Sequence, residues 1–396
     1  MASLSLGRTR GVRPAPVARS ALVITVVHNP QDARIRQRQI NALLAAGWKV
    51  TYVAPFRGFG LEVPPSRPAG LGRGSLRCLN IARSSGRRRF PAWRAARTVL
   101  RALAQDHDVV LVHDPELVLA AAGLGMKNLI WDVHEDPAAA LQVKSWMPKP
   151  LRRPFATAWR QAERMVERRH HLLLAEYSYQ ARFRRRHPVV SNSVSVPRLV
   201  MPPGGERVSY LGTVSMSRGC KTMIEVGHEL RRRTNGAVRL EVIGEAADAE
   251  AKEALQEAAE VGDLSWLGFV PSEQALARVG GSLAGLCLLQ DLPNYRVSLP
   301  TKIMEYCALG VPVITTPLPL AAGLIRSEDV GFEVPWEDPT AVVEAILHLR
   351  AKPELRWQMG ANGHKVALRD YDWNRLSLDF VRTMNATASR LALNTG

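Results

Sequence analysis

Residues 21–55 read ALVITVVHNPQDARIRQRQINALLAAGWKVTYVAP, and this stretch decides the class of fold. Its first part, residues 21–30, is an apolar run that predicts a buried strand leading into a loop. Residues 32–48 carry apolar side chains at helical spacing and end near Gly47, and residues 49–55 return to an apolar strand. Strand, helix and strand in this order are typical of a parallel, doubly wound sheet.

The same pattern continues through the chain in two sets. After a long, mobile connection at residues 57–90, we expect further strands of the first set at 108–117, 128–137, 172–178 and 189–194. A linker at residues 198–206 then precedes a second set, with strands at 207–213, 238–246, 264–271, 283–289 and 330–335 and a helix at 220–234. A chain of 396 residues is long enough for two such domains.

We therefore predict an α/β protein of two Rossmann-like parallel-sheet domains that face an interdomain cleft. The expected divisions are a disordered basic leader at 1–20, an N-terminal domain at 21–200, a C-terminal domain at 201–370, and a C-terminal helix at 371–396 that crosses back to the N-terminal domain.

The composition narrows the classes of function. The formal net charge is +17, and arginines cluster in the leader, in residues 83–101 and in residues 152–186. A surface of this kind suits anionic lipid, a phosphorylated substrate or nucleic acid, although no nucleic-acid-binding module is recognisable. Four scattered cysteines argue against a zinc site or a disulfide framework. No apolar run reaches the length of a membrane span, and residues 1–20 do not resemble a secretory signal, so we expect a cytoplasmic protein.

Polar side chains follow two expected strands of the first set. His113 and Asp114 end one strand, and His134, Glu135 and Asp136 end the next. Parallel sheets bind their ligands at the carboxyl ends of the strands, so these side chains are candidate site residues. No metal-binding spacing such as HExxH is present, and we expect no metal site. A glycine-rich dinucleotide loop, a phosphate-loop lysine motif and a GxSxG motif are also absent, which disfavours nicotinamide enzymes, P-loop proteins and serine hydrolases.

The second set carries a candidate diphosphate site. Gly212 makes a turn after a strand, and Arg218 stands just before a helix, where backbone amides and a guanidinium can bind phosphates. The segment TKIMEYCALGVPVITT, residues 301–316, predicts a short helix and a buried strand. Lys302 and Glu305 share one face of that helix, where the lysine can meet a phosphate and the carboxylate two ribose hydroxyls. A surface ion pair between them is the alternative.

These residues resemble a known family. KIMEYCALGVPVI (302–314) is similar to the donor-site signature of retaining GT-B glycosyltransferases of the large bacterial nucleotide-sugar-dependent family. DARI (32–35), VHDPEL (112–117) and WDVHEDPAAALQVKSWMPKPLR (131–152) resemble the branch that acts on lipopolysaccharide, capsule and related envelope polysaccharides. The resemblance implies transfer of a sugar from a UDP- or GDP-sugar, a substrate rather than a cofactor, to a carbohydrate or lipid-linked acceptor. A non-catalytic protein of the same fold, binding a nucleotide-sugar or a partner, is the alternative.

The resemblance also implies roles for individual residues. His134 is the candidate catalytic residue and contacts the donor sugar, Gly212, Arg218 and Lys302 bind the diphosphate, and Glu305 binds the ribose. The leaving phosphate acts as the base, so no enzymatic nucleophile is required. Further sugar or acceptor contacts are assigned to His113, Asp114, Glu135, Tyr295, Arg296 and Ser298.

One position departs from the family pattern. The family carries a first glutamate eight positions before the second, and here that position is Val297. Either the contact is lost, or Asp291, Tyr295, Arg296 or Ser298 replaces it.

A basic amphipathic helix is expected at residues 87–103. It would place Trp93, Ala96, Leu100 and Leu103 on one stripe with arginines beside it. Such a helix lies on an anionic membrane surface, and we therefore expect peripheral attachment to the inner face of the membrane. A helix that packs against its own domain is the alternative.

Overall fold

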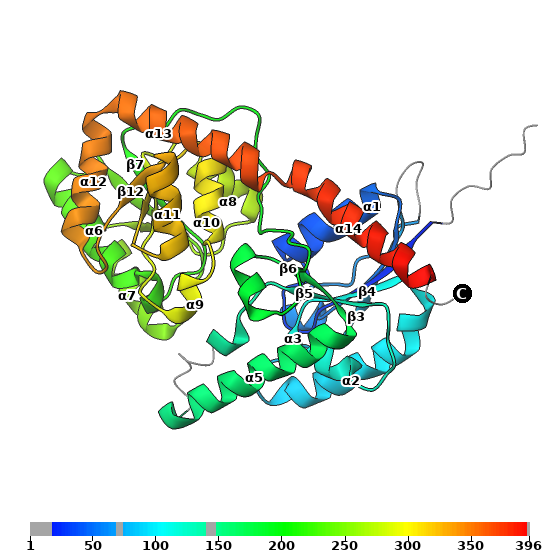
Figure 1. The fold of residues 1–396 in the computed structure, drawn as a ribbon. Coiled ribbons are helices and arrows are strands. Elements are labelled where there is room, and N and C mark those ends of the chain that lie inside the picture. The colour runs from blue at the N-terminus through cyan, green and yellow to red at the C-terminus, as the bar shows by residue number, and fades with distance from the viewer. Residues whose placement is uncertain (1–17, 69–73, 140–147, 394–396) are drawn as a thin grey trace, which may run out of the picture. The chain divides into compact units, whose positions relative to one another are not determined.

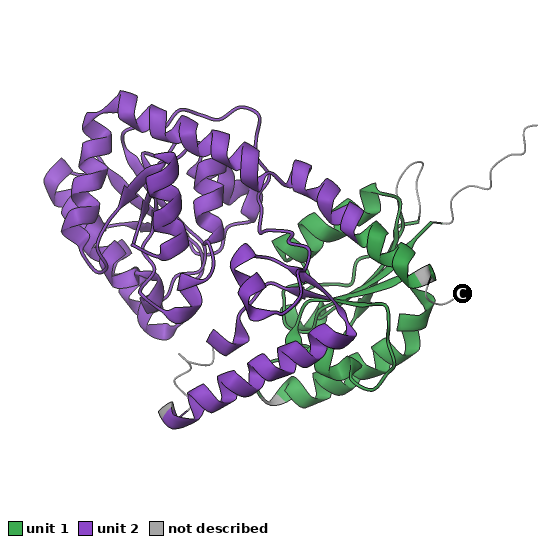
Figure 2. Ribbon diagram, viewed as in Figure 1, with its two compact units in different colours: residues 1–130, 384–396 green, residues 131–383 purple. Residues whose placement is uncertain are grey.

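The computed structural model describes residues 18–68, 74–139 and 148–393 (Figure 1). The chain divides into two compact units, residues 1–130 with 384–396 and residues 131–383 (Figure 2). It contains two six-stranded parallel sheets flanked by helices, which confirms the predicted class of two Rossmann-like sheets. Most of the expected leader, residues 1–17, lies outside the described part, as do residues 140–147 of the envelope-type motif.

The first sheet has the strand order β3-β2-β1-β4-β5-β6. Its strands are β1 (Ser20–Ile24), β2 (Lys49–Ala54), β3 (Leu76–Asn80), β4 (Val109–Val112), β5 (Leu129–Val133) and β6 (His171–Leu174). The order runs outward in opposite directions from β1 and β4, so the topological switch point of this sheet lies between those two strands, both in unit 1.

Two expectations for this sheet are wrong. Residues 57–90 are not only a connection, because β3 lies within them and pairs in parallel with β2. Residues 189–194 form no strand; Val189 and Val194 make only isolated bridges, to Leu174 and Asp372. In the first segment, glycines, prolines and arginines masked the pattern of a strand that pairs with β2. Within the described part of the chain, the second segment has no strand paired along its length.

The helix expected at residues 32–48 is shorter and partly π-helical. It runs as π-helical turns over Ala33–Ile40 and continues as α1 (Asn41–Ala45). The carboxylate of Asp32 accepts hydrogen bonds from the backbone N–H groups of Arg34 and Ile35, both at 2.9 Å, and so caps the first turn. Gly47 has a φ of 83°, a left-handed conformation that ends the helix before β2.

Helix α2 (Arg89–Leu103) packs its small apolar face within unit 1. Ala92, Ala96 and Leu100 are fully buried, and α2 contacts α3 (Pro115–Ala121). This corrects the prediction that a stripe containing Ala96 and Leu100 faces a lipid surface. Arg97 of α2 donates to the backbone carbonyls of Ala120 at 2.8 Å and Ala122 at 2.7 Å, and so binds the last turn of α3.

The second sheet lies in unit 2 and has the order β12-β11-β10-β7-β8-β9. Its strands are β7 (Arg207–Leu211), β8 (Arg239–Ile243), β9 (Ser265–Trp266), β10 (Ala284–Cys287), β11 (Val313–Thr315) and β12 (Gly331–Glu333). The switch point lies between β7 and β10. Two helices begin at this edge: α6 (Cys220–Thr234), which follows β7, and α10 (Thr301–Ala308), which lies between β10 and β11.

The last helix, α14 (Trp373–Leu393), ends within unit 1. There, Arg19, which lies just before β1, donates hydrogen bonds from its guanidinium to the side chains of Asn385 and Ser389, the second at 2.7 Å. Arg19 was assigned to the leader from the sequence, and the structure instead places it in a defined contact. Among the described residues, no helix combines the length and the apolar character that a membrane span requires.

Candidate functional site

The loops at the switch point of the second sheet bring together three residues predicted to bind a diphosphate. Gly212 directly follows β7 with a φ of 108°, a conformation that other residues rarely adopt. A side chain at Gly212 would stand 3.9 Å from both Cε and Nζ of Lys302. At Gly244, a Cβ atom would lie only 2.1 Å from the carbonyl oxygen of Gly212, so the backbone of this turn is closely packed from behind.

Arg218 closes the short 3-10 turn Met216–Arg218, and α6 begins two residues later. Between them, Gly219 has a φ of 86°, and a Cβ there would lie 2.3 Å from the carbonyl oxygen of Leu288. The hydroxyl of Ser217 lies 3.2 Å from that of Tyr295, which ties this turn to α9 (Pro293–Arg296). The loop therefore holds Arg218 in a defined position at the amino-terminal end of a helix, where phosphates bind well.

Lys302 is buried, with a side-chain environment unusual for a lysine. It is 8% exposed, and its Nζ makes no hydrogen bond within the described part of the chain. The ammonium stands over the ring of Tyr210, with Nζ 3.4 Å from the ring centroid. Burial lowers the pKa of Lys302 to about 7; the charge of Arg218 acts in the same direction, and Cys287 and Glu305 act against it.

Glu305 follows one turn later on α10 and is half-buried. Lys302 is buried, and its Nζ has no hydrogen-bond partner among the described residues, so the alternative of a surface ion pair between Lys302 and Glu305 does not describe this helix. The two side chains influence each other through charge across the shared face instead. This face presents a cation and then a carboxylate in the order that a diphosphate and a ribose would need.

The residues around Val297 differ in exposure and in the side chains that they contact. Arg296 is exposed and forms an ion pair with Asp291, while Val297 and Ser298 are half-buried. Tyr295 contacts Ser217, as described above, and so approaches the turn that carries Arg218. Of the residues considered as replacements for the missing glutamate, Tyr295 is therefore the one joined to the candidate diphosphate site.

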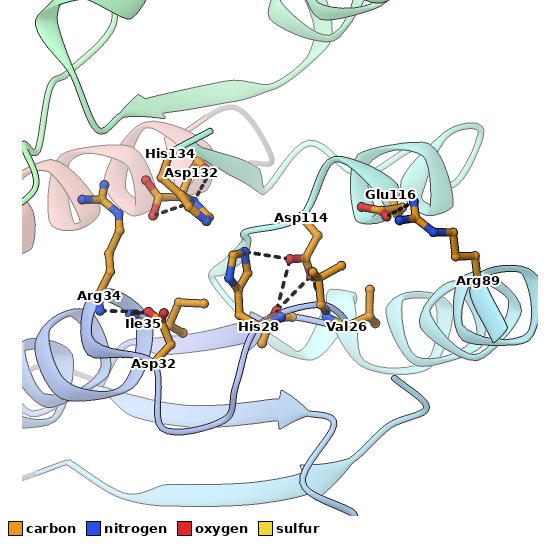
Figure 3. A network of polar contacts seen from close by, with 12 residues as sticks. Val26, His28, Asp32, Arg34, Ile35, Arg89, Asp114, Glu116, Asp132 and His134 are labelled. Atoms are coloured by element: carbon orange, nitrogen blue, oxygen red, sulfur yellow. Dashed lines mark hydrogen bonds and ion pairs between the residues drawn. The ribbon is translucent and has the colours of Figure 1, made fainter. Parts of the chain in front are cut away.

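Unit 1 contains a buried carboxylate, that of Asp114, at the switch point of the first sheet. The sequence analysis assigned Asp114 to sugar or acceptor contacts. Asp114 is 1% exposed, and its oxygens accept hydrogen bonds from the Thr25 hydroxyl at 2.9 Å and from the Val26 N–H at 2.6 Å (Figure 3). Nε2 of His28 lies 3.2 Å from the same carboxylate. Asp114 thus holds the loop after β1 and orients His28, and its assignment to sugar or acceptor contacts stays a prediction.

Burial by itself would raise the pKa of the Asp114 carboxyl. The hydrogen bond and charge of His28, with the bonds from Val26 and Thr25, outweigh burial and hold the pKa below its ordinary value. His113, next to it in sequence, is also buried, and its backbone N–H bonds to the Ile24 carbonyl at 3.4 Å. The position of His113 accords with a structural role at the end of β4.

In unit 2, His134 follows β5 and is half-buried. Its Nδ1 lies 3.1 Å from the backbone carbonyl of Asp132 (Figure 3). A carbonyl oxygen only accepts, so Nδ1 carries the hydrogen and Nε2 carries the lone pair in the neutral ring. Such a ring can accept a hydrogen bond from a sugar hydroxyl.

The loop after His134 is fixed by arginines. Arg160, on α5 (Lys149–Arg169), donates to both carboxylate oxygens of Asp136, at 2.8 and 2.6 Å. Arg182 donates to the backbone carbonyl of Glu135 at 2.9 Å and forms an ion pair with buried Glu163. The Glu135 side chain is exposed. These bonds restrict the backbone on which His134 is carried.

Two histidines of these loops lie beside carboxylates. His28 lies beside Asp114 in unit 1, and His134 lies beside Asp132 in unit 2, with Nδ1 to Oδ2 at 3.9 Å. The sequence-based expectation that no metal takes part stays a prediction.

Sequence reasoning missed two residues of these sites. His28 follows the apolar run at residues 21–27 that contains the first strand, so the rule that selected His113 and His134 from strand ends applied to it as well. Tyr210 lies inside an apolar strand, and nothing local indicates that its ring face meets a lysine. Only the fold brings Tyr210 and Lys302 together.

Solved structures of known proteins share this architecture over nearly the whole chain. Sucrose-phosphate synthase from Thermosynechococcus elongatus is 15% identical, with a TM-score of 0.72 over 94% of this chain and 100% of that one. The Anabaena protein HepE, solved in complex with UDP and glucose, is 11% identical, with a TM-score of 0.66 over 93% and 99%. WaaG, a glycosyltransferase involved in lipopolysaccharide biosynthesis, is 11% identical, with a TM-score of 0.63 over 91% and 98%. No curated protein sequence matches the chain.

These likenesses establish the fold, which is the GT-B fold of two Rossmann-like domains. Residues 205–352, which contain Gly212, Arg218, Lys302 and Glu305, match the family model described as "Glycosyl transferases group 1". The protein is therefore a glycosyltransferase enzyme with a group 1 domain in its second half.

Proposed function

We propose that this enzyme moves a sugar from a UDP- or GDP-linked donor to a cell-envelope polysaccharide or lipid-linked acceptor, with retention of the anomeric configuration. The main support for a nucleotide-sugar donor is the environment of Lys302. Lys302 is buried beside the Gly212 turn and near the charge of Arg218, and its Nζ finds no hydrogen-bond partner in the part of the chain that the structure describes. A buried ammonium needs acceptors, and a diphosphate supplies them.

The roles of the other residues follow from the chemistry of such a donor. Glu305, one turn along α10, takes the ribose hydroxyls, and Nε2 of His134 orients the transferred sugar. When the bond between the anomeric carbon and the diphosphate breaks, negative charge develops on the leaving phosphate. Arg218, Lys302 and the amino-terminal end of α6 stabilise that charge, and the leaving phosphate receives the proton of the acceptor hydroxyl.

Known proteins of this fold support the choice of substrates. HepE has been solved with UDP and glucose, TarM with UDP and α-GlcNAc-glycerol, and WaaG acts in lipopolysaccharide biosynthesis. A nucleotide-sugar donor and an envelope-type acceptor are therefore the first substrates to test.

The test is a panel of UDP- and GDP-sugars, each incubated with the purified enzyme and with lipid-linked or oligosaccharide acceptors. We expect one donor to release nucleoside diphosphate in an acceptor-dependent manner. Proton NMR of the product is expected to show the same anomeric configuration as the donor. Inverted product would contradict retention, and binding of a donor without any turnover would favour the non-catalytic alternative.

We also propose that the enzyme works at an anionic membrane surface, which it meets through the exposed side of α2. Phe90 is 65% exposed and stacks on Trp93, with ring centroids 5.9 Å apart. Arg88, Arg89 and Arg94 are exposed beside this aromatic pair. Aromatic and basic side chains together favour the boundary between lipid headgroups and acyl chains.

A further inference from the structure

When no ligand is bound, the buried environment of Lys302 offers too few groups to stabilise a proton on its amine. A protonated lysine has three donors, and Nζ of Lys302 makes no hydrogen bond to any described residue. Its close contact is the face of the Tyr210 ring, at 3.4 Å from the centroid, and that face attracts a cation. The Tyr210 hydroxyl donates to the Thr213 carbonyl at 2.8 Å, which fixes the ring in place.

Groups on several elements around Lys302 affect its charge. The positive charge of Arg218 disfavours a second cation, whereas the carboxylate of Glu305 and the sulfur of Cys287 favour one. Burial raises the pKa of the Cys287 thiol to about 11, so its thiolate forms, and favours a cation at Lys302, only at high pH. Tyr306, on the same helix as Lys302, is buried, and its hydroxyl donates to the Leu286 carbonyl at 3.1 Å.

We propose that Tyr210 is a positioning residue that holds Lys302 in a resting state, and that a bound diphosphate draws Lys302 from the ring and adds a proton to its amine. This inference rests on the proposed donor site and goes beyond it. The proton comes from solvent, the amine becomes an ammonium, and the phosphate oxygens accept the hydrogen bonds that the empty site does not provide. Substrate binding and proton uptake are then a single event.

The direction of the effect follows from proton linkage. In the free enzyme, burial first, and Arg218 second, lower the pKa of Lys302 to about 7. The negative diphosphate raises that pKa in the complex. Above pH 7 the complex therefore holds a proton that the free enzyme lacks, and donor affinity falls by up to about tenfold for each pH unit.

The experiment is titration calorimetry with UDP-glucose and GDP-glucose in two buffers of different ionisation enthalpy, at pH 6, 7 and 8. These donors are suitable probes because a diphosphate esterified at both ends lacks the ionisation near about pH 6 of a phosphate monoester. For the unaltered enzyme, we expect donor binding to be accompanied by uptake of almost one proton at pH 8, about half a proton at pH 7, and little at pH 6. Lys302→Met should bind more weakly and take up no proton. Lys252→Met, at an exposed lysine of α7 (Ala249–Glu260), should behave like the unaltered enzyme.

Tyr210 is tested by a matched pair of variants. Tyr210→Phe keeps the ring face and should keep the proton uptake of the unaltered enzyme. Tyr210→Leu removes the ring, so Lys302 should lose its proton more readily in the free enzyme, and uptake at pH 7 should rise toward one proton. Equal uptake in the Phe and Leu variants would overturn the role of Tyr210.

The remaining outcomes separate this inference from the proposed function. Binding of either donor with no proton uptake at pH 8 would overturn the linkage and leave the donor site intact. Absence of binding by every nucleotide-sugar would overturn the donor site and the linkage together. If Tyr210→Leu does not fold, the comparison of the unaltered enzyme with Lys302→Met and Lys252→Met still decides whether Lys302 takes up the proton.

Discussion

Glu305 provides the most direct test of the donor site at the scale of one residue. Glu305→Ala removes the carboxylate that we expect to accept hydrogen bonds from the ribose hydroxyls, so those hydroxyls lose their acceptor. We expect the affinity for the nucleotide-sugar to fall by about 10- to 100-fold. Calorimetry with the donor measures this, and Glu273→Ala, at an exposed position on α8 (Ser272–Val279), is the control. Unchanged affinity in a folded Glu305→Ala enzyme would remove the ribose assignment.

His134 should affect turnover rather than nucleotide binding. Its ring is held through Nδ1 by the Asp132 carbonyl, and we assign Nε2 to the sugar, which a free nucleotide lacks. His134→Ala is therefore expected to lower kcat by about 100-fold or more, in the range typical of positioned catalytic groups, while the Kd for nucleoside diphosphate changes little. The exposed His228 offers a control substitution, His228→Ala. A parallel loss of nucleotide affinity would contradict the assignment.

Asp114 should make the stability of the enzyme depend on acid pH. Its folded-state pKa lies below the ordinary value of 3.8, so the carboxylate stabilises the fold at pH values above that ordinary value. This contribution is lost as the pH falls through the lower, folded-state pKa. Urea unfolding between pH 2.5 and 6 should therefore show that Asp114→Asn is less stable at pH 6 and that its free energy of unfolding changes less steeply below about pH 4. Parallel curves for the two proteins would contradict this prediction.

At the scale of an element, α2 has two distinct sides. Ala92, Ala96 and Leu100 form the packed side, whereas Phe90 and Trp93 form an aromatic pair beside exposed arginines. A sequence stripe defined only by helical spacing does not distinguish these sides, because alanine fits both a domain core and a lipid-facing surface. The position of α3 decides which side is buried.

Phe90→Ser should weaken binding to acidic vesicles. The substitution removes an exposed apolar ring and leaves the packed side of α2 intact, and each arginine near an anionic surface contributes about 1 kcal/mol to attraction. In flotation with phosphatidylglycerol vesicles, the unaltered enzyme should bind at low salt and dissociate at high salt, and Phe90→Ser should bind less. Val261→Ser, at an exposed position in unit 2, is the control. Equal binding to neutral vesicles would contradict the proposal.

At the scale of the whole molecule, α14 belongs to both units. It begins in unit 2 at Trp373, and its last turns lie in unit 1, where Arg19 bonds to Asn385 and Ser389. Arg19→Ala should therefore release the end of α14. Hydrogen exchange measured by mass spectrometry should show faster exchange in residues 384–393 and unchanged exchange in residues 373–380. Arg390→Ala, which alters α14 without touching this contact, serves for comparison, and equal protection in both variants would contradict the assigned contact.

Local sequence patterns are enough to predict the class of fold and the edge of each sheet at which polar residues gather. Apolar periods alternate between strand and helix strongly enough to predict two parallel sheets, and parallel strands direct their carboxyl ends to one edge. Gly212, Arg218, Lys302 and Glu305 were found in this way. Short-range patterns carry this information because the spacing of side chains is set by the local backbone.

The tertiary structure decided the environments in which those residues act. Strand β3 exists because β2 offers it a neighbour, although its own sequence, with Arg77 and Asn80, is only partly apolar. Asp114 is buried by the loop after β1, which the sequence places far from it along the chain. The pKa of Lys302 depends on burial and on Arg218, and its resting contact depends on Tyr210, a residue of another element. Burial and charge are properties of what surrounds a side chain, and only the folded chain determines those surroundings.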